Sequence, residues 1–110
     1  INTYILGGYA KPDQNLIIGE DTEKKVSNMN FDVAFLGTMG IDKEAGFTTS
    51  LLIDGDVKRA VIKSSKECYI LADKSKFNIR RFYTYGNFNE GTIITDSKID
   101  FNCDGLDIIY

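Results

Sequence analysis

The chain has 110 residues, 43% of them hydrophobic and 26% charged, which is the balance of one folded domain rather than of a disordered segment. Thirteen basic against sixteen acidic residues give a net charge of −3, so the chain has no positive surplus for holding DNA or RNA. The longest apolar run, residues 68–72, is far too short to span a membrane, so we expect no membrane partner.

The first half of the chain alternates short apolar runs with one amphipathic stretch. Strands are predicted at 3–6, 16–18 and 33–36, with a short strand or loop at 47–49. The run at 33–36 is apolar on both faces, as in a central strand that helices cover. Acidic residues open the segment 20–30 and lysines follow, which predicts a short surface helix. Because Ile1 stands just before the first strand, we expect an N-terminally truncated piece of a longer protein.

The second half changes its hydrophobic period and then returns to short strands. Apolar and small residues fall at i, i+3, i+4 and i+7 from Val57 to Ser64, which predicts one face of a helix. Asp54 or Asp56 is available as its N-terminal cap. Further strands are predicted at 68–72, 92–95 and 106–110. Alternating strands and helices predict an α/β fold, with a mostly parallel sheet and helices on both faces.

In open α/β sheets, ligands bind at the carboxyl ends of the strands, so loops at those ends are the candidate sites. The loop after the strand 33–36 carries Gly37, Gly40 and Asp42. Glycines let backbone amides approach an anion, and a carboxylate accepts hydrogen bonds from sugar hydroxyls. The alternative is a tight turn that Asp42 caps. Gly7 and Gly8 form a similar but less specific loop.

A second candidate loop follows the strand 68–72 and carries Asp73, Ser75 and Lys76. A lysine and a hydroxyl just past a strand can bind phosphate, as a charge and a donor. The alternative is a solvated turn that Asp73 caps through its side chain. Basic residues continue to Arg81 and alternate with aromatic ones, a pattern also found on nucleic-acid-binding surfaces. The acidic charge of the whole chain disfavours that interpretation.

The composition argues against a catalytic site or a metal site. The absence of histidine excludes histidine-dependent catalysis and most zinc sites, and the two cysteines have no metal-binding spacing. Cys68 lies in an apolar run and is expected to be a core residue rather than a nucleophile. We therefore expect neither a metal nor a cofactor. The residues by themselves indicate an α/β domain with a small-anion site.

A set of short motifs, in fixed order and spacing, resembles one known family. The set comprises the strand and loop at 31–42, Gly46-Phe47-Thr48, residues 57–60, the segment 70–77 and Ile93-Ile94-Thr95-Asp96. It resembles the C-terminal effector-sensing domain of DeoR-type transcriptional repressors, over most of the chain from about Tyr4 to Asp96. Gly7 and Gly8 fit the same pattern.

The resemblance implies a Rossmann-like fold of the phosphosugar isomerase and CoA transferase type. In the family, an N-terminal winged helix-turn-helix binds the operator, and a phosphorylated sugar bound to the sensor releases it. The resemblance thus assigns DNA binding to a domain absent from this chain. It also implies that the sensor's first strand, with its phosphate loop, is absent. Such regulators are expected to be cytoplasmic homo-oligomers.

Carried over residue by residue, the resemblance assigns ligand contacts to the candidate loops. It places Gly37, Gly40 and Asp42 beside the sugar and Lys76 near its phosphate. Thr48 stands where the family turns back toward the pocket. These five positions form the ligand site that the resemblance predicts.

The resemblance to the family is less close at the helix positions Asp54 and Lys58. The residue at position 39 bears on whether the chain could be an enzyme. Asp54 falls where many members carry a glutamate, and Lys58 matches their helix lysine. The related ribose-phosphate isomerases carry an acid at the position of Met39, together with a catalytic lysine in a glycine-rich stretch that this sequence lacks. Because isomerisation needs a base and a polarising group together, the first hypothesis is a sensor without catalysis. A phosphosugar isomerase-like enzyme of the same fold is the alternative.

Overall fold

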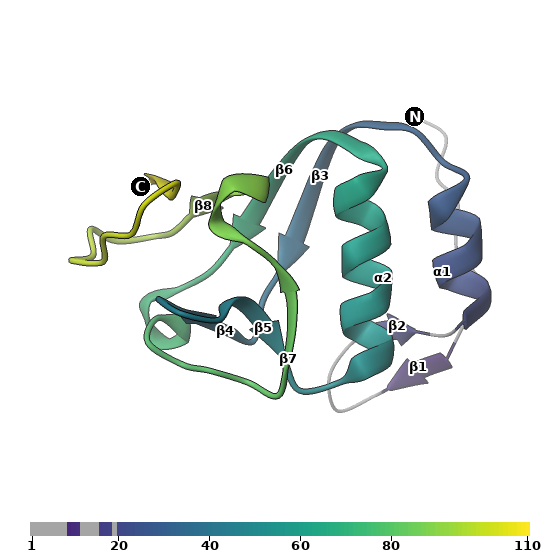
Figure 1. Ribbon diagram of the computed structural model, residues 1–110, viewed down its shortest axis with the longest axis horizontal. Coiled ribbons are helices and arrows are strands. Elements are labelled where there is room, and N and C mark those ends of the chain that lie inside the picture. The colour runs from purple at the N-terminus through teal and green to yellow at the C-terminus, as the bar shows by residue number, and fades with distance from the viewer. Residues whose placement is uncertain (1–8, 12–15, 19) are drawn as a thin grey trace.

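Four parallel strands organise the protein, whose computed structural model describes residues 9–11, 16–18 and 20–110. They are β3 (Phe31–Gly37), β6 (Ser65–Leu71), β8 (Thr92–Ile94) and β9 (Asp107–Ile109), in the spatial order β3-β6-β8-β9 (Figure 1). Every neighbouring pair in this sheet is parallel. The predicted α/β class with a mostly parallel sheet is therefore confirmed. The strand expected at 3–6 and the pair Gly7 and Gly8 lie outside the described residues.

One helix packs against the parallel sheet, and a second helix packs on the first. Helix α2 (Leu52–Lys63) contacts β3 and β6, and α1 (Glu20–Ser27) packs against α2 (Figure 1). The hydroxyl of Ser64 donates to the carbonyl of Val26 at 3.0 Å and joins the ends of the two helices. The surface helix expected within 20–30 is confirmed. No helix in the described part of the chain is both long and apolar enough to cross a lipid bilayer.

Helix α2 begins before both residues that the sequence offers as caps. Its N-cap is Leu51, which makes no side-chain hydrogen bond. Asp54 lies inside the first turn, where its carboxylate accepts a hydrogen bond from the Thr49 hydroxyl at 2.7 Å. The carboxylate of Asp56 accepts a bond from a tyrosine hydroxyl at 2.7 Å. The cap prediction is wrong because the helix starts at Leu52, so Asp54 and Asp56 lie inside it and bond to other side chains.

Smaller elements surround the parallel sheet. A three-stranded antiparallel sheet, in the order β4-β5-β7, consists of β4 (Gly40–Asp42), β5 (Gly46–Thr49) and β7 (Tyr83–Gly86). β1 (Tyr9–Lys11) pairs with β2 (Leu16–Ile18), and two 3₁₀ turns, η1 (Lys74–Lys76) and η2 (Phe88–Glu90), follow β6 and β7. The strands expected at 16–18 and 47–49 are thus confirmed, while β1, β4 and β7 are additional.

The core lies between the parallel sheet, α2 and the antiparallel sheet. Its largest fully buried side chains include Phe47, Tyr85 and Ile70. The segment 95–106 links β8 to β9 without a helix and contributes Phe101, whose ring meets Phe77 and Phe88 edge-on. An irregular loop with one large aromatic anchor thus closes the core where an α/β crossover usually places a helix.

One face of the parallel sheet departs from the sequence-based expectation. Ala34 and Leu36 pack against the core, but the alternate positions Val33 and Phe35 are 43% and 61% exposed. Leu71 on the neighbouring strand is 45% exposed. Because α1 packs on α2, it does not cover this second face. The expectation that helices cover both faces of β3 is therefore not met within the described residues, and the exposed side chains form an apolar surface.

Candidate functional site

The carboxyl ends of β3 and β6 bring the two candidate loops together. Gly37 at the end of β3 pairs in register with Leu71 at the end of β6. Just beyond these ends, Ile41 forms a bridge with Phe77, and the amide of Ile79 donates to the carbonyl of Ile41 at 3.2 Å. The loop with the paired glycines and the loop with the phosphate-type lysine therefore lie side by side, as parallel strand ends require.

The two glycines of the first loop have opposite surroundings. A Cβ atom at Gly37 would meet no heavy atom within 4 Å, so the backbone there is open to close approach. A Cβ at Gly40 would overlap the carbonyl oxygen of Ile79 and lie 2.8 Å from Oγ1 of Thr48. Internal packing therefore requires glycine at position 40, whereas position 37 leaves room for a ligand.

Asp42 is held in a turn beside this loop. Its Oδ2 accepts hydrogen bonds from the amides of Glu44 at 3.0 Å and Ala45 at 2.9 Å. The guanidinium of Arg80 lies 2.9 Å from the same oxygen. The Ala45 amide, with Arg80 adding to its effect, lowers the pKa of Asp42. These bonds are those of the capped turn that the sequence offers as the alternative, and a sugar contact by Asp42 stays a prediction.

Thr48 is fully buried beneath the same loop. Its hydroxyl donates to the carbonyl of Gly40 at 3.2 Å and accepts from the amide of Arg81 at 2.9 Å. The hydroxyl of Thr38 donates to the carbonyl of Gly40 at 3.2 Å or to that of Thr48 at 3.3 Å. Thr48 thus fixes the path of the loop through its neighbours, and no part of its side chain faces solvent.

Asp54 and Lys58 form a buried ion pair on α2. The Lys58 ammonium lies 3.1 Å from Oδ2 of Asp54, and both side chains are at least nine-tenths buried. The ammonium also lies 5.2 Å from the ring centre of Tyr85, whose pKa burial raises. Leaving one charge of such a pair without its partner costs about 3–5 kcal/mol. The pair anchors α2 against the core behind the candidate loops.

Lys76 ends the turn η1 and lines a cavity. In this turn, the Asp73 carboxylate accepts hydrogen bonds from the hydroxyl and, at 2.8 Å, from the amide of Ser75. The Ser75 hydroxyl contributes most to lowering the pKa of Asp73. The capped turn is therefore confirmed, and the cap presents Lys76 at the end of the sheet. The cavity measures about 440 Å³ and is lined by Leu71, Ala72, Asp73, Lys76, Ile94, Thr95 and Asp96.

Two residues of this cavity were missed as site residues at the sequence level. Thr95 and Asp96 follow β8 at the same edge of the sheet as Gly37 and Lys76. The prediction of a strand reaching residue 95 placed Thr95 inside the sheet rather than at its end. Ligands bind beyond the carboxyl ends of parallel strands. A prediction that ended this strand at Ile94 would therefore have counted both residues as site candidates.

The basic and aromatic stretch after η1 is divided between core and surface. Phe77 and Tyr85 are buried in the core, and Arg80 pairs with Asp42 and Glu44. Because core packing accounts for two of the aromatic residues, the alternation does not describe one stacking surface for bases. Within the described residues, no cluster of acidic or cysteine side chains could hold a metal ion.

Most of the chain is similar in sequence to one family of transcriptional regulators. The model of the DeoR C-terminal sensor domain matches residues 1–97. The chain belongs to the DeoR family of transcriptional regulators. It is 38% identical over 104 residues to an uncharacterized HTH-type transcriptional regulator, FruR, of Bacillus subtilis, covering 94% of this chain and 41% of that protein.

Two further relatives extend this comparison. The HTH-type transcriptional repressor GlcR of Bacillus subtilis is 34% identical over 109 residues, which cover 97% of this chain and 42% of that protein. The glycerol-3-phosphate regulon repressor of Haemophilus influenzae is 32% identical over 84 residues, which cover 76% of this chain and 32% of that protein. The chain therefore spans about two fifths or less of the length of these curated relatives.

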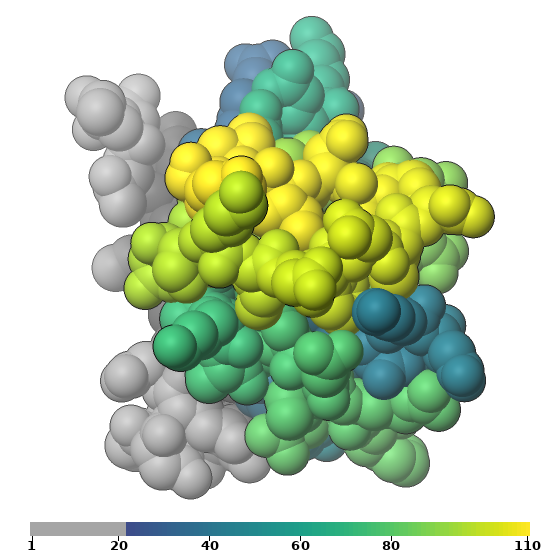
Figure 2. Space-filling view, turned by 90° about the vertical axis from the view of Figure 1, so that its left-hand side faces the viewer, coloured from purple at the N-terminus to yellow at the C-terminus, as the bar shows by residue number. Residues whose placement is uncertain are grey.

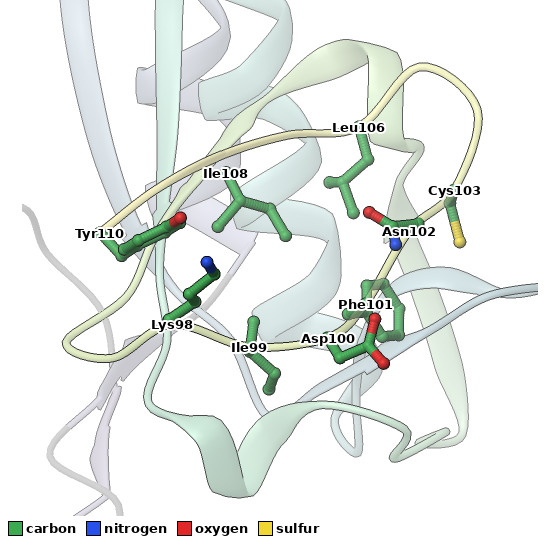
Figure 3. A pocket seen from close by; sticks show the side chains of 9 residues that line it. All are labelled: Lys98, Ile99, Asp100, Phe101, Asn102, Cys103, Leu106, Ile108 and Tyr110. Carbon is green, nitrogen blue, oxygen red and sulfur yellow. The ribbon is translucent and has the colours of Figure 1, made fainter.

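A larger cavity lies outside the part that matches the sensor domain. It measures about 700 Å³ and is lined only by residues between Lys98 and Tyr110. These residues lie across one side of the molecule, in yellow in Figure 2. Leu106 and Ile108 point toward the stretch that carries Ile99 (Figure 3). Because the family match ends at residue 97, this cavity is not built from the sensor residues that the match covers.

Proposed function

We propose that this chain is the effector-sensing part of a DeoR-type transcriptional repressor. It binds a phosphorylated sugar at the carboxyl edge of β3, β6 and β8. Binding changes the affinity of an N-terminal helix-turn-helix, which lies outside this chain, for its operator. The chain itself performs no catalysis.

The cavity beside Lys76 is the observation that carries this proposal. Its volume of about 440 Å³ suits a small phosphorylated sugar, because small-molecule sites span roughly 300–1,000 Å³. Lys76 supplies positive charge for a phosphate, and Thr95 and Asp96 supply groups that bond to hydroxyls. Gly37 pairs with Leu71 of the cavity wall and leaves its backbone open. Asp42 and Gly40 complete the loop next to this edge.

Met39 supports binding without turnover. It stands where the resembling isomerases carry an acid, and its sulfur lies 3.4 Å from both the Thr49 hydroxyl and the Ser50 amide. A thioether cannot act as a general base. Asp54 and Lys58 are paired with each other in the interior, so we assign them a structural role rather than proton transfer.

Our proposals for DNA binding, assembly and location are supported by family membership rather than by the site. The net charge of −3 supports assigning DNA contacts to the helix-turn-helix alone. We further propose that the intact regulator is a cytoplasmic homo-oligomer. The exposed apolar face with Val33 and Phe35 supports a contact made by this domain. One relative is named as the glycerol-3-phosphate regulon repressor, which supports a phosphorylated effector here.

Operator release by the intact regulator tests the proposal. We would titrate the repressor–operator complex with ribose 5-phosphate, glucosamine 6-phosphate and glycerol 3-phosphate, and follow the loss of DNA anisotropy. Lys76→Ala should weaken the effective compound about 5- to 150-fold, the equivalent of 1–3 kcal/mol for one charge-assisted bond. Lys74→Ala is the matched control, because Lys74 lies in the same turn but does not line the cavity.

Three results would count against the proposal. The first is the absence of release by every phosphorylated sugar. The second is equal loss of response in the Lys76 and Lys74 variants, which would place the phosphate elsewhere. The third is the conversion of any of these compounds into an isomer, detected by chromatography. That result would favour the enzyme alternative.

A further inference from the structure

Thr95 has an unusual environment at the end of β8. Its side chain is 6% exposed, and its hydroxyl oxygen is shielded from solvent without a hydrogen-bond partner. It is the only buried side-chain nitrogen or oxygen in the described part of the chain with this property. A buried polar atom left unpaired costs roughly 1–3 kcal/mol, so such atoms require an explanation.

The other buried threonines near the sheet edge show what a structural hydroxyl does here. Thr38 and Thr48 donate to the carbonyl of Gly40, and Thr49 donates to Asp54. Valine has nearly the same shape as threonine and would fill the Thr95 position without an unpaired oxygen. Packing therefore accounts for the shape of the Thr95 side chain but not for its hydroxyl.

The position of Thr95 connects this hydroxyl to the cavity beside Lys76. Thr95 lines that cavity, and its own amide donates to the carbonyl of Ile109 at 3.0 Å, which fixes its backbone. Threonine moves its hydroxyl between staggered positions by one rotation about χ1. Contact between this hydroxyl and a ligand in the cavity therefore requires such a rotation, which leaves the backbone in place.

We propose that Thr95 is a ligand-contacting residue of the effector site and that its hydroxyl pairs with a hydroxyl group of the bound sugar. This inference rests on the proposed function. The charges around the cavity support a sugar hydroxyl rather than a phosphate as the partner. Asp96 is adjacent in sequence and repels an anion, whereas Lys76 comes from the neighbouring loop and attracts one. The threonine hydroxyl both donates and accepts, as a sugar hydroxyl does.

Paired substitutions in the intact regulator test this role. Thr95→Val keeps the shape and removes the hydroxyl, and Thr95→Ser keeps the hydroxyl. We expect Thr95→Val to weaken binding of the effective compound, among ribose 5-phosphate, glucosamine 6-phosphate and glycerol 3-phosphate, about five- to tenfold by calorimetry. Thr95→Ser should bind within about twofold of the wild type. Thr92→Val, at the start of the strand that precedes Thr95 and away from this cavity, should leave binding unchanged.

Two further readouts separate a ligand contact from a structural role. Without ligand, Thr95→Val should unfold at the same temperature as the wild type or higher, because an unpaired buried hydroxyl is removed. Inorganic phosphate should bind Thr95→Val as it binds the wild type and should bind Lys76→Ala more weakly.

The outcomes distinguish this inference from the proposed function. If Lys76→Ala weakens binding and Thr95→Val does not, the role of Thr95 is wrong while the sensor site stands. A clear fall in the unfolding temperature of Thr95→Val would show an internal partner and would also overturn the inference. If the wild type binds none of the three compounds, both the proposed function and this inference fail.

Discussion

Gly37 and Gly40 flank the short loop between β3 and β4, and the structure predicts opposite results when each is replaced by alanine. At Gly40 the new Cβ would overlap the carbonyl oxygen of Ile79 and press on the Thr48 hydroxyl. Overpacking of this kind costs roughly 1–3 kcal/mol, and disturbing the hydrogen bonds of Thr48 adds about 1 kcal/mol. We therefore expect Gly40→Ala to lower the free energy of unfolding by about 2–4 kcal/mol.

At Gly37 the new Cβ would enter open space. Alanine restricts the unfolded chain more than glycine does, so Gly37→Ala should leave the free energy of unfolding unchanged or raise it by up to about 1 kcal/mol. The same methyl group should obstruct a ligand that approaches the backbone, so effector binding should weaken while stability does not.

Urea unfolding of the intact regulator, followed by circular dichroism, measures the first effect. With a slope of about 2 kcal/mol per molar urea, the unfolding midpoint of Gly40→Ala should fall by roughly 1–2 M. The midpoint of Gly37→Ala should not fall. Equal midpoints for the two variants would refute the assignment of Gly40 to packing. Wild-type effector binding by Gly37→Ala would show that no ligand approaches that backbone.

Further predictions concern pH, the core and DNA. Arg59 lowers the pKa of Glu90, so this pair stabilises the fold above the ordinary glutamate pKa and loses its effect as pH falls through the lowered value. The unfolding temperature of Glu90→Gln should therefore change less than that of the wild type between about pH 5 and 3. Phe101→Ala should cost about 3–5 kcal/mol in urea unfolding, because it leaves a void between two aromatic rings. The 110-residue chain alone should give no specific operator band in a gel shift at low salt.

Much of the fold could be predicted from the sequence because the parallel strands carry strong apolar runs. The strands at 33–36 and 68–72 and the helix after residue 50 are set by local hydrophobic patterns. The start of α2 could not be predicted, because its cap residue Leu51 makes no side-chain hydrogen bond and so leaves no capping signal in the sequence. The exposed face of β3 could not be predicted either, since an apolar strand looks the same whether one or both faces are covered.

The connection between β8 and β9 is a second feature that the sequence pattern could not predict. Parallel strands are usually joined through a helix, but residues 95–106 form none. The loop instead places Phe101 against Phe77 and Phe88. A single aromatic anchor of this kind leaves no periodic signal in the sequence, so its position emerges only from the packing.

The residues of the proposed ligand site fall into two groups that their sequence pattern does not distinguish. Glycines, threonines and acids in such a motif can either shape a loop or offer groups to a ligand, and the residue type alone does not tell which. Thr48 and Asp42 have their polar atoms bonded to neighbouring backbone, so they account for the shape of the loop. Thr95 has an unpaired hydroxyl at the cavity, and Lys76 brings the charge that a phosphate requires. The polar atoms that the fold leaves unsatisfied, rather than the residue types in the motif, therefore point to the contacts a ligand would make.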